Sequence, residues 1–364
     1  MRKIKRRKKT TDQNVKDVVK KRKNQKVRVE FLGSGCTTLN LALSGKGKAG
    51  GWARGRVVNI VGDGSSGKTL LALELAFWCF KYIKKVRSKI FPKVKKLIIV
   101  YNNCEGVMDF PLEEMYGEDF VKFITWEYSK TIEHMGRDYA RRLGSLKKGH
   151  FLLYFIDTWD AIGSEAGHKR FEKSVEEGKE IESSYALEKQ KYASMFFENL
   201  SGKMEHNKYD STLVIISQVR TKIGTTFGKK TYRAGGKALD FYTHQVAWIR
   251  EIEKLRKTKR KKKRVYGIKS EVKVERSKVG KPFRESDFTI LYDYGLDNIS
   301  AMVDFLWGKK VIRFNGKKFK ARSAFIRYIE KGNREDELIK KTEEEWNEVE
   351  EAFRKEVRKR KPRY

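Results

Sequence analysis

The feature that most constrains this chain is a glycine-rich octapeptide between an apolar run (57–61) and a helical stretch (70–82). The octapeptide consists of Gly62, Asp63, Gly64, Ser65, Ser66, Gly67, Lys68 and Thr69. Glycines at this spacing let backbone N–H groups surround phosphates, the lysine reaches the terminal phosphates, and the threonine hydroxyl can bind Mg²⁺. The positive end of the following helix attracts the same anion. We therefore predict a phosphate-binding loop, with Leu70 completing the nucleotide contacts; the alternative is a Gly/Ser turn that matches by chance.

Charge is the second constraint. The 364 residues include 83 Lys and Arg against 47 Asp and Glu, which gives a formal net charge of +36. Such an excess indicates a polyanionic partner, and nucleic acid is the first candidate. A hydrophobic content of 39% is enough for a sizeable core, and the length favours about two domains.

Targeting and redox signals are weak. No apolar stretch approaches the roughly 20 residues that span a bilayer, and no hydrophobic segment follows the N-terminal charges. We expect a cytoplasmic protein that lies with DNA and has no membrane partner. Cys36, Cys79 and Cys104 lack C-x-x-C spacing, so we expect reduced thiols in or near the core.

The chain divides by composition into three segments. Residues 1–33 contain a basic arm with a short helix and strand, 34–296 have an α/β pattern, and 297–364 form a small C-terminal domain with a basic tail. Four apolar strand candidates with helices between them favour a mostly parallel sheet: 56–61, 97–102, 151–156 and 212–217.

Two hairpins are expected later in the chain. Strand candidates at 243–252 and 269–275 flank the tract 254–264, in which nine of eleven residues are basic. That much like charge cannot be buried, so the tract is predicted to be a hairpin tip. A tight hairpin is predicted at 314–319 and charged helices over 323–358.

Polar residues follow the strand candidates. Asp157 ends an apolar strand, where it can hold the Mg²⁺ side of the site; a turn or helix cap is the alternative. Glu105 lies just beyond the end of another strand and is the candidate base that activates water, although an exposed loop glutamate without a role fits equally well. Gln218 closes the fourth strand, where its amide can sense the terminal phosphate.

A long loop after Gln218 is the most discriminating stretch. Residues 219–239 combine glycines, cations and one aromatic side chain, Phe227, before a helix. Mobile backbone, cations and an apolar wedge suit a loop that binds single-stranded nucleic acid. The alternative is a loop that is simply disordered.

Together these residues resemble the RecA-type homologous recombinases. The resemblance runs from Ser34-Gly35 through the octapeptide, Glu105, Asp157 and Gln218, and it continues through Lys222-Ile223-Gly224, Gly235-Gly236, Pro282-Phe283 and 290–292, and weakly through 315–316 to 344–346. It covers most of the chain, and the loop after Gln218 is specific to that family.

The resemblance implies a RecA-like P-loop core, with a mostly parallel central sheet flanked by helices, an N-terminal arm and a small C-terminal α/β lobe. It also implies a homo-oligomeric helical filament on single-stranded DNA that pairs the strand with homologous double-stranded DNA and hydrolyses ATP when DNA is bound. ATP and Mg²⁺ would be the cofactors, with Lys68, Glu105 and Gln218 as catalytic residues and Thr69 and Asp157 on the metal.

Further roles follow from the same resemblance. Asp109 would lie near the adenine, and Arg276 and Lys278 would touch the ATP of a neighbouring subunit. The implied DNA contacts are Ser194, Arg220, Lys222, Ile223, Gly224, Phe227, Arg233, Gly235, Gly236 and Lys237.

The chain departs from the family pattern at Asp240, at Glu198 and in the first DNA-loop region, about 168–184. Asp240 lies where a bacterial member has a lysine, and Glu198 replaces a basic residue on the DNA side. Two other functions stay open: a hexameric RecA-fold helicase or motor, and a DNA-coating protein that uses ATP only for assembly.

Overall fold

The computed structural model describes most of the chain. The described residues are 29–83, 91–106, 108–178, 185–205, 210–221, 231–233, 236–309 and 311–356. The chain divides into two units, Met1–Glu30 and Phe31–Tyr364, and every element named below belongs to the second. Among the described helices, none combines the length and the apolar character that crossing a membrane requires.

A ten-stranded sheet forms the centre of the second unit. Its strands run in the order β12 (Gly295–Leu296), β11 (Glu285–Leu291), β10 (Lys262–Ser277), β9 (Gln245–Lys259), β3 (Val57–Gly62), β7 (Ser211–Thr221), β6 (His150–Asp157), β4 (Lys96–Asn103) and β5 (Thr125–Glu127), and β8 (Thr231–Arg233) pairs with β7. The six strands from β9 to β5 are parallel, and β10, β11 and β12 are antiparallel. The predicted α/β class and mostly parallel sheet are confirmed.

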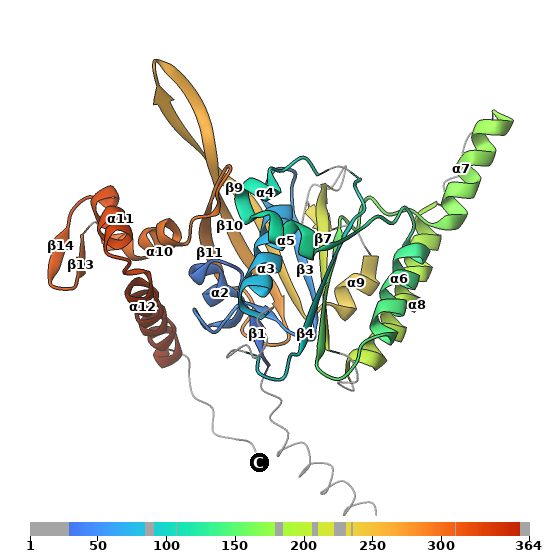
Figure 1. The fold of residues 1–364 in the computed structure, drawn as a ribbon, viewed down its shortest axis with the longest axis horizontal. Coiled ribbons are helices and arrows are strands. Elements are labelled where there is room, and N and C mark those ends of the chain that lie inside the picture. Colours follow the sequence, from blue (N-terminus) through green and yellow to red (C-terminus); the bar gives the residue numbers. More distant parts are fainter. Residues whose placement is uncertain are drawn as a thin grey trace, which may run out of the picture. The chain divides into compact units, whose positions relative to one another are not determined.

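Helices cover both faces of the sheet (Figure 1). One face carries α2 (Thr37–Ser44), α3 (Lys68–Ile83), α4 (Leu112–Tyr116) and α5 (Glu118–Phe123), and the other carries α6 (Ile132–Gly144), α8 (Tyr185–Glu205) and α9 (Gly236–Tyr242). Each face has its own core cluster: the first includes residues of α2 and α3, and the second includes residues of α6, α8 and α9. In β6, alternate side chains join the two clusters, Phe151, Leu153 and Phe155 the first and Leu152, Tyr154 and Ile156 the second. Because both faces are covered, the strand is a continuous apolar run rather than an alternating one.

The region 168–184 corrects one expectation. The resemblance implies the first DNA-binding loop at about 168–184, but helix α7 (Glu165–Glu177) occupies the first part of this region, and 179–184 lie outside the described residues. The Ser164 hydroxyl accepts a hydrogen bond from the Gly167 N–H, which caps the helix start. Lys173 and Glu177 form an i,i+4 pair at 3.5 Å. Local capping and pairing therefore make a helix of this mixed-charge segment.

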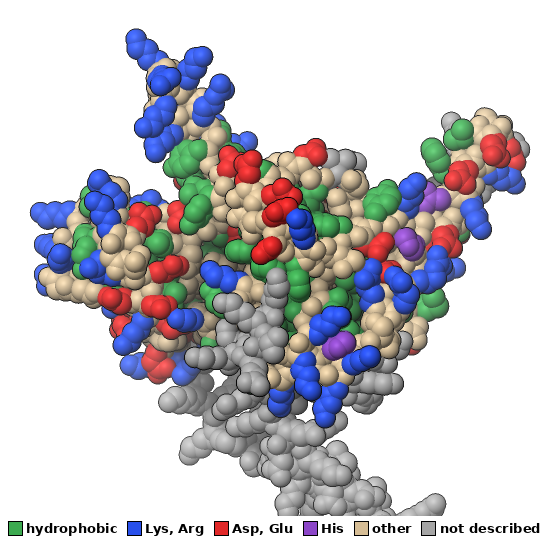
Figure 2. All heavy atoms as spheres, in the orientation of Figure 1, with side chains coloured by type: hydrophobic (Ala, Val, Ile, Leu, Met, Phe, Trp, Pro, Cys, Tyr) green, Lys and Arg blue, Asp and Glu red, His purple; other side chains and the backbone are tan. Residues whose placement is uncertain are grey.

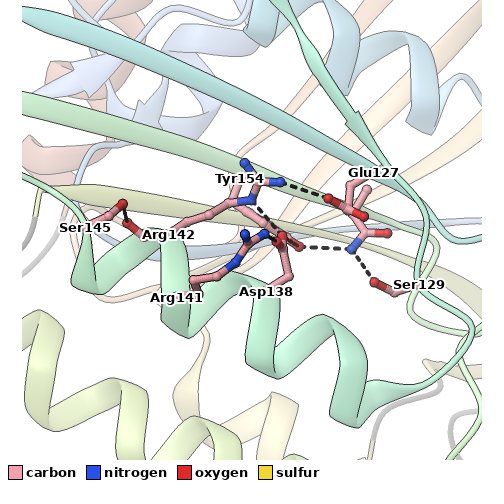
Figure 3. Close-up of polar contacts among 8 residues, drawn as sticks. Glu127, Ser129, Asp138, Arg141, Arg142, Ser145 and Tyr154 are labelled. Atoms are coloured by element: carbon pink, nitrogen blue, oxygen red, sulfur yellow. Dashed lines mark hydrogen bonds and ion pairs between the residues drawn. The ribbon is translucent and has the colours of Figure 1, made fainter.

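A buried polar cluster joins α6 to the sheet (Figure 3). Asp138 accepts hydrogen bonds from Arg142 Nε at 2.7 Å, Arg141 Nη2 at 2.6 Å and the Tyr154 hydroxyl at 2.9 Å. Arg142 also donates to Glu127 on β5 at 2.8 Å. Burial alone would raise the pKa of Asp138, but these hydrogen bonds outweigh it and lower that pKa. The cluster fixes α6 against β5 and β6.

The C-terminal segment contains α10 (Asn298–Leu306), η1 (Trp307–Lys309), β13 (Ile312–Phe314), β14 (Lys317–Phe319), α11 (Arg322–Lys331) and α12 (Glu335–Glu356). It has a core of its own around Phe314 and Phe325. Asn315 and Gly316, with φ of 48° and 73°, form the turn of the predicted hairpin. The hairpin and the charged helices are therefore confirmed, while the domain boundaries stay a prediction.

Contacts from α12 reach the central sheet. Trp346 packs against Phe305 with ring centroids 5.7 Å apart and belongs to the first core cluster. Glu350 accepts hydrogen bonds from Arg284 at 2.8 Å and Lys281 at 2.6 Å, and the Arg284 hydrogen bond is the main cause that lowers the pKa of Glu350 to about 2. This segment is therefore anchored to the core through both apolar and ionic contacts.

All three cysteines are buried and free, as expected. Cys36, Cys79 and Cys104 lie on different elements or loops, and burial raises the pKa of each thiol, to about 12 for Cys104. Thiols with such pKa values are protonated and unreactive at neutral pH. They act as small apolar side chains in the core.

Glu74 is a buried carboxyl group on α3. It accepts hydrogen bonds from the Leu296 N–H and from the Tyr116 hydroxyl, both at 3.1 Å. Burial raises its pKa from 4.5 to about 7, although the two hydrogen bonds act in the opposite direction. Between pH 4.5 and 7 the unfolded chain loses a proton that the folded chain keeps, so this group makes stability fall as pH rises through that window.

We predict that Glu74→Gln removes this pH dependence. The free energy of unfolding of the variant, relative to the parent, should rise by up to about 3 kcal/mol between pH 4.5 and 8, because 2.5 pKa units correspond to that energy. Urea denaturation at several pH values measures it. Glu114→Gln, at an exposed position on α4, should show no such trend. Parallel pH profiles for Glu74→Gln and the parent would contradict the prediction.

Candidate functional site

The polar residues singled out in the sequence meet at one edge of the sheet. Gly62 at the end of β3 pairs with Gln218 on β7, and Asn103 at the end of β4 pairs with Asp157 at the end of β6. Because these strands are parallel, their carboxyl ends lie at the same edge, where open α/β sheets bind ligands. Glu105 follows β4 at this edge. The fold thus gathers the glycine-rich loop, both acids and Gln218 in one place.

The glycine-rich loop has the backbone that its sequence requires. A Cβ atom at Gly62 would lie 2.6 Å from the carbonyl oxygen of Ile249, so a side chain cannot be accommodated there. Gly67 has φ of 92°, and a Cβ at this position would collide with the Ile290 side chain. Helix α3 begins at Lys68, so its N-terminal N–H groups face the loop. This geometry forms an anion-binding cradle.

Lys68 folds back over that loop. Its ammonium group donates a hydrogen bond to the Asp63 carbonyl at 2.6 Å, and its side chain is buried. Burial lowers its pKa, while the nearby carboxylates of Asp157 and Glu105 act to raise it. A buried cation that bonds to the loop's own backbone is poised to exchange this carbonyl for a phosphate oxygen.

Asp157 is the buried acid of the site. Its Oδ2 accepts a hydrogen bond from the Tyr101 hydroxyl at 2.7 Å, whereas Oδ1 is buried and has no hydrogen-bond partner among the described residues. Burial raises its pKa, and hydrogen bonds with Tyr101 and Thr69 oppose that effect. An unsatisfied buried oxygen next to a hydroxyl fits Mg²⁺, which commonly takes one or two protein ligands together with phosphates and water. The described residues contain no group of three His, Cys, Asp or Glu side chains that would form an all-protein cage.

Glu105 and Gln218 are in direct contact. The Gln218 amide donates to Glu105 Oε1 at 3.2 Å, and the Thr158 hydroxyl donates to the same oxygen at 2.9 Å. Asp160 Oδ2 in turn accepts the backbone N–H of Gln218 at 2.7 Å. Both Glu105 and Gln218 are exposed, so water can reach them. Two donors thus hold one oxygen of the Glu105 carboxylate, although the side chain as a whole is exposed.

A cavity of about 530 Å³ adjoins the loop. It is lined by Ser65, Gly67, Lys68, Thr69 and Leu70 on one side and by Phe110, Pro111, Met115, Ile268, Ile290, Leu291, Tyr292 and Asp293 on the other. One side carries the backbone of the glycine-rich loop and the Lys68 cation, and the other is mostly apolar and aromatic. That combination suits a ligand with a phosphate chain and an aromatic base. Asp109 is exposed and precedes Phe110, but it does not line this cavity.

The structure corrects the predicted loop 219–239: β7 continues to Thr221, β8 (Thr231–Arg233) pairs with it, and α9 begins at Gly236, because the two ends of the segment pair as strands. The end of β7 and the strand β8 are therefore the two roots of a shorter connection, whose other residues lie outside the described part of the chain. Lys222, Ile223, Gly224, Phe227 and Gly235 lie outside the described residues. At the outgoing root, Arg220 is exposed and lies 3.6 Å from Asp160. Gly236 and Lys237 begin helix α9, and Ser194 is exposed on α8, where its hydroxyl donates to the Gln190 carbonyl at 3.0 Å.

Arg233, at the returning root, lies in a different environment from the one expected of a DNA contact. Its guanidinium group is buried and donates hydrogen bonds to Asp240 on α9, through Nε at 2.8 Å, and to Asn59 inside β3. Asn59 also donates to the Ile215 carbonyl at 2.8 Å and the Ser217 hydroxyl at 2.9 Å on β7. In this conformation Arg233 ties the end of the loop to the strand that carries the glycine-rich loop, and it is not accessible to DNA.

Arg276 and Lys278 lie at the opposite edge of the sheet. Ser277 pairs with Gln245 at the start of β9, which pairs with Val58 near the start of β3. His244 lies beside them, and burial together with Lys278, Arg56 and Arg276 lowers its pKa to about 4. The two cations therefore belong to a positive edge, and the fold does not bring them to the glycine-rich loop of the same chain.

Sequence reasoning missed several residues of the site. Tyr101, Thr158 and Asp160 hold Asp157, Glu105 and Gln218 in place. Asp160 gave a signal, since a second carboxylate follows Asp157 in the same turn. Tyr101 and the apolar cavity walls gave none, because their positions depend on how distant strands pair.

Comparison with known proteins agrees with this geometry. A family model described as the RecA N-terminal domain matches residues 4–87 and 173–297. Protein RecA of Prochlorococcus marinus (strain SARG) is 27% identical over 324 residues, which is 87% of this chain and 76% of the relative. Protein RecA of Gloeothece citriformis is 26% identical over 314 residues, 84% and 78% of the two chains. Since the family model covers more than half of the sequence, the chain belongs to the RecA family of ATP-binding recombinases.

Proposed function

We propose that this protein is a DNA-dependent ATPase that forms a helical filament on single-stranded DNA and catalyses homologous pairing and strand exchange. The observation that carries the proposal is the hydrogen bond between Gln218 and Glu105 at the edge of the glycine-rich loop. Gln218 lies on the strand that leads into the loop 219–239, so one residue contacts both the candidate base and the start of the candidate DNA loop.

The triphosphate of ATP would occupy the loop 62–69, with its base against Phe110 and Tyr292 in the adjoining cavity. Lys68 would exchange the Asp63 carbonyl for a phosphate oxygen. Thr69 and Asp157 would hold Mg²⁺, which supplies charge neutralisation on the phosphates when it is bound. The unpartnered Oδ1 of Asp157 supports this assignment.

Glu105 would orient and deprotonate the attacking water. Its Oε1 is held by Thr158 and Gln218, and its side chain is exposed to solvent. A general base needs this combination of fixed position and access to water. A rearrangement of Gln218 toward the terminal phosphate would release its contact with Glu105 and disturb the hydrogen bond from its backbone N–H to the Asp160 side chain, which also lies 3.6 Å from the Arg220 guanidinium.

The returning root of the DNA loop is coupled to the same core. Arg233 bonds to Asn59 inside β3, and Asn59 bonds to β7. Both ends of the loop therefore attach to strands that end at the phosphate site. Such a double attachment allows nucleotide state to change the conformation of the loop, with Lys222, Phe227 and Lys237 as proposed DNA contacts.

The positive edge at Arg276 and Lys278 supports assembly. These cations lie on the far side of the sheet from the chain's own phosphate loop, and Arg276 has no ion pair with a described residue. In a head-to-tail filament this edge would meet the phosphate site of the next copy, where cations stabilise transferring phosphate charge.

We predict that Lys68→Ala weakens ATP binding. Removing a charged hydrogen bond to phosphate costs about 1.5 to 3 kcal/mol, so the Kd for ATP should rise by roughly tenfold to a hundredfold. Fluorescent nucleotide titration measures the Kd, and electron microscopy should find no ATP-dependent filaments. Lys122→Ala, an exposed lysine on α5, is the control and should bind ATP like the parent. Unchanged affinity in Lys68→Ala would contradict the nucleotide assignment.

We predict that Glu105→Gln binds ATP and single-stranded DNA but turns over at least about a hundredfold more slowly, because loss of a general base costs that much. Steady-state ATPase assays with and without single-stranded DNA measure the effect, and Glu114→Gln serves as the charge-matched control. This variant also separates strand exchange with hydrolysis from a coating protein that never hydrolyses ATP. If turnover on DNA is unchanged, Glu105 is not the base.

We predict that Gln218→Ala uncouples DNA binding from nucleotide. ATP affinity should remain within about twofold of the parent, while the increase in single-strand affinity on adding ATP should disappear, since the contact with Glu105 is lost. Fluorescence anisotropy of a labelled oligonucleotide, with and without ATP, measures this. Asn347→Ala, an exposed amide on α12, should behave like the parent. Retention of the full ATP effect in Gln218→Ala would refute the coupling role.

A further inference from the structure

Strands β9 and β10 extend beyond the sheet as a two-stranded ribbon (Figure 1). They pair with each other as far as Lys259 and Lys262, whereas β3 pairs with β9 only up to Ile249 and β11 pairs with β10 only from Gly267 onward. The end of the ribbon, residues 254–264, is called the ribbon tip below. β11 stays paired with β10 as far as Gly267, which lies opposite Leu255, so the part of the ribbon with no third strand beside it is about four residues a strand, or about 13 Å at about 3.3 Å a residue.

The ribbon tip is almost entirely cationic. Nine of its eleven residues are Lys or Arg, and all nine are exposed. Lys254 lies 3.7 Å from Glu251, and the other eight form no ion pair with any residue that the structure describes. Figure 2 shows Lys and Arg side chains over the whole end of the ribbon, with carboxylates confined to its base. This charge has no counterpart within the described chain.

Local stability does not explain these cations. Lys259 pairs directly with Lys262, and Lys257 with Arg264, and like charges in such pairs repel. The turn residues Arg260 and Lys261 have φ of 48° and 62°, a conformation that favours Asn-Gly. The β13–β14 hairpin of the same chain has that Asn-Gly pair in its turn. An isolated two-stranded ribbon is marginally stable even without repulsion.

We propose that the ribbon tip binds the major groove of duplex DNA, at a site separate from the loop 219–239. The major groove is about 12 Å wide and admits a two-stranded β-ribbon, and rows of phosphates flank it on both sides. Cations on both faces of the tip suit this environment. The set Lys257, Lys259, Lys262 and Arg264 lies on one face, and Arg256 and Lys263 lie on the other.

The same geometry argues against other polyanions. A flat anionic surface would contact one face of the ribbon and leave the cations of the other face unpaired. The major groove of A-form RNA is too narrow and deep for a ribbon to enter. Phosphate contacts position a protein without reading sequence, so the tip would hold duplexes of any sequence. The proposed contact needs no nucleotide, so an experiment can disprove it without disproving the proposed ATP-driven reaction.

The test compares two triple variants of the full chain that carry the same charge change. The first is Lys259→Gln, Lys262→Gln and Lys263→Gln on the ribbon tip, which leaves the turn residues intact. The second is Lys93→Gln, Lys147→Gln and Lys148→Gln, at exposed positions near the starts of β4 and β6, at the other edge of the sheet. Anisotropy of a labelled DNA duplex of about 20 base pairs is measured without nucleotide between about 50 and 200 mM salt.

We expect the ribbon-tip variant to bind duplex DNA at least about tenfold more weakly and with a salt slope smaller by two to three, because each lost phosphate contact removes about 0.9. The control variant should keep both values within error. Affinity for a single-stranded oligonucleotide with ATP, and ATP turnover on it, should stay within about twofold of the parent. An RNA duplex of the same sequence should show little difference between the variants.

Three results would overturn the proposal. Equal loss of duplex affinity in the two variants would mean that net charge, not the ribbon tip, governs binding. Equal loss on the RNA duplex would exclude groove insertion. Loss of single-strand binding in the ribbon-tip variant would make the tip part of the other DNA site. An unfolding midpoint no lower than that of the parent confirms that each variant is folded, and removing repelling lysines should not lower it.

Discussion

The parallel pairing of β3, β7, β6 and β4 is the constraint on which the site depends. Both faces of these strands are buried, so polar groups can gather only where the strands end. Register then brings Gly62 beside Gln218 and Asn103 beside Asp157. The phosphate loop, the buried acid and the Glu105–Gln218 pair become neighbours because the apolar strands align. The chemistry of the site is thus positioned by the packing of the core.

The buried polar groups divide into satisfied and unsatisfied ones. Asp138 on α6 accepts hydrogen bonds from Arg141, Arg142 and Tyr154, so both of its carboxylate oxygens have partners and its role is structural (Figure 3). Within the described part of the chain, Asp157 keeps one buried oxygen without a hydrogen-bond partner, and the Lys68 ammonium group donates its hydrogen bond to a carbonyl of its own loop. This incomplete satisfaction supports the proposal that Asp157 and Lys68 bind a ligand. The same contrast distinguishes buried Arg233 from exposed Arg220.

Charge is distributed over separate regions. The edge with Arg276 and Lys278 lies opposite the phosphate loop, and the ribbon tip extends beyond the loop's own edge. A single-site binding protein needs only one such region. Cations at several distant positions support the proposed contacts with a neighbouring copy and with single-stranded and duplex DNA.

The sequence by itself determined the glycine-rich loop, the apolar strands, the parallel direction of the central strands and the charged hairpin, because these depend on local periodicity, on the helices between strands and on residues with few alternative conformations. It also indicated Asp157, Glu105 and Gln218, since each lies at or just beyond the end of an apolar run, although β7 continues past Gln218 to Thr221. Only the tertiary structure decided that Tyr101 and Thr158 hold the acids, that Arg233 is buried against Asn59, and that 165–177 form a helix. Those outcomes depend on which distant strands become neighbours and on how much water they exclude, and a pattern along one chain does not contain that information.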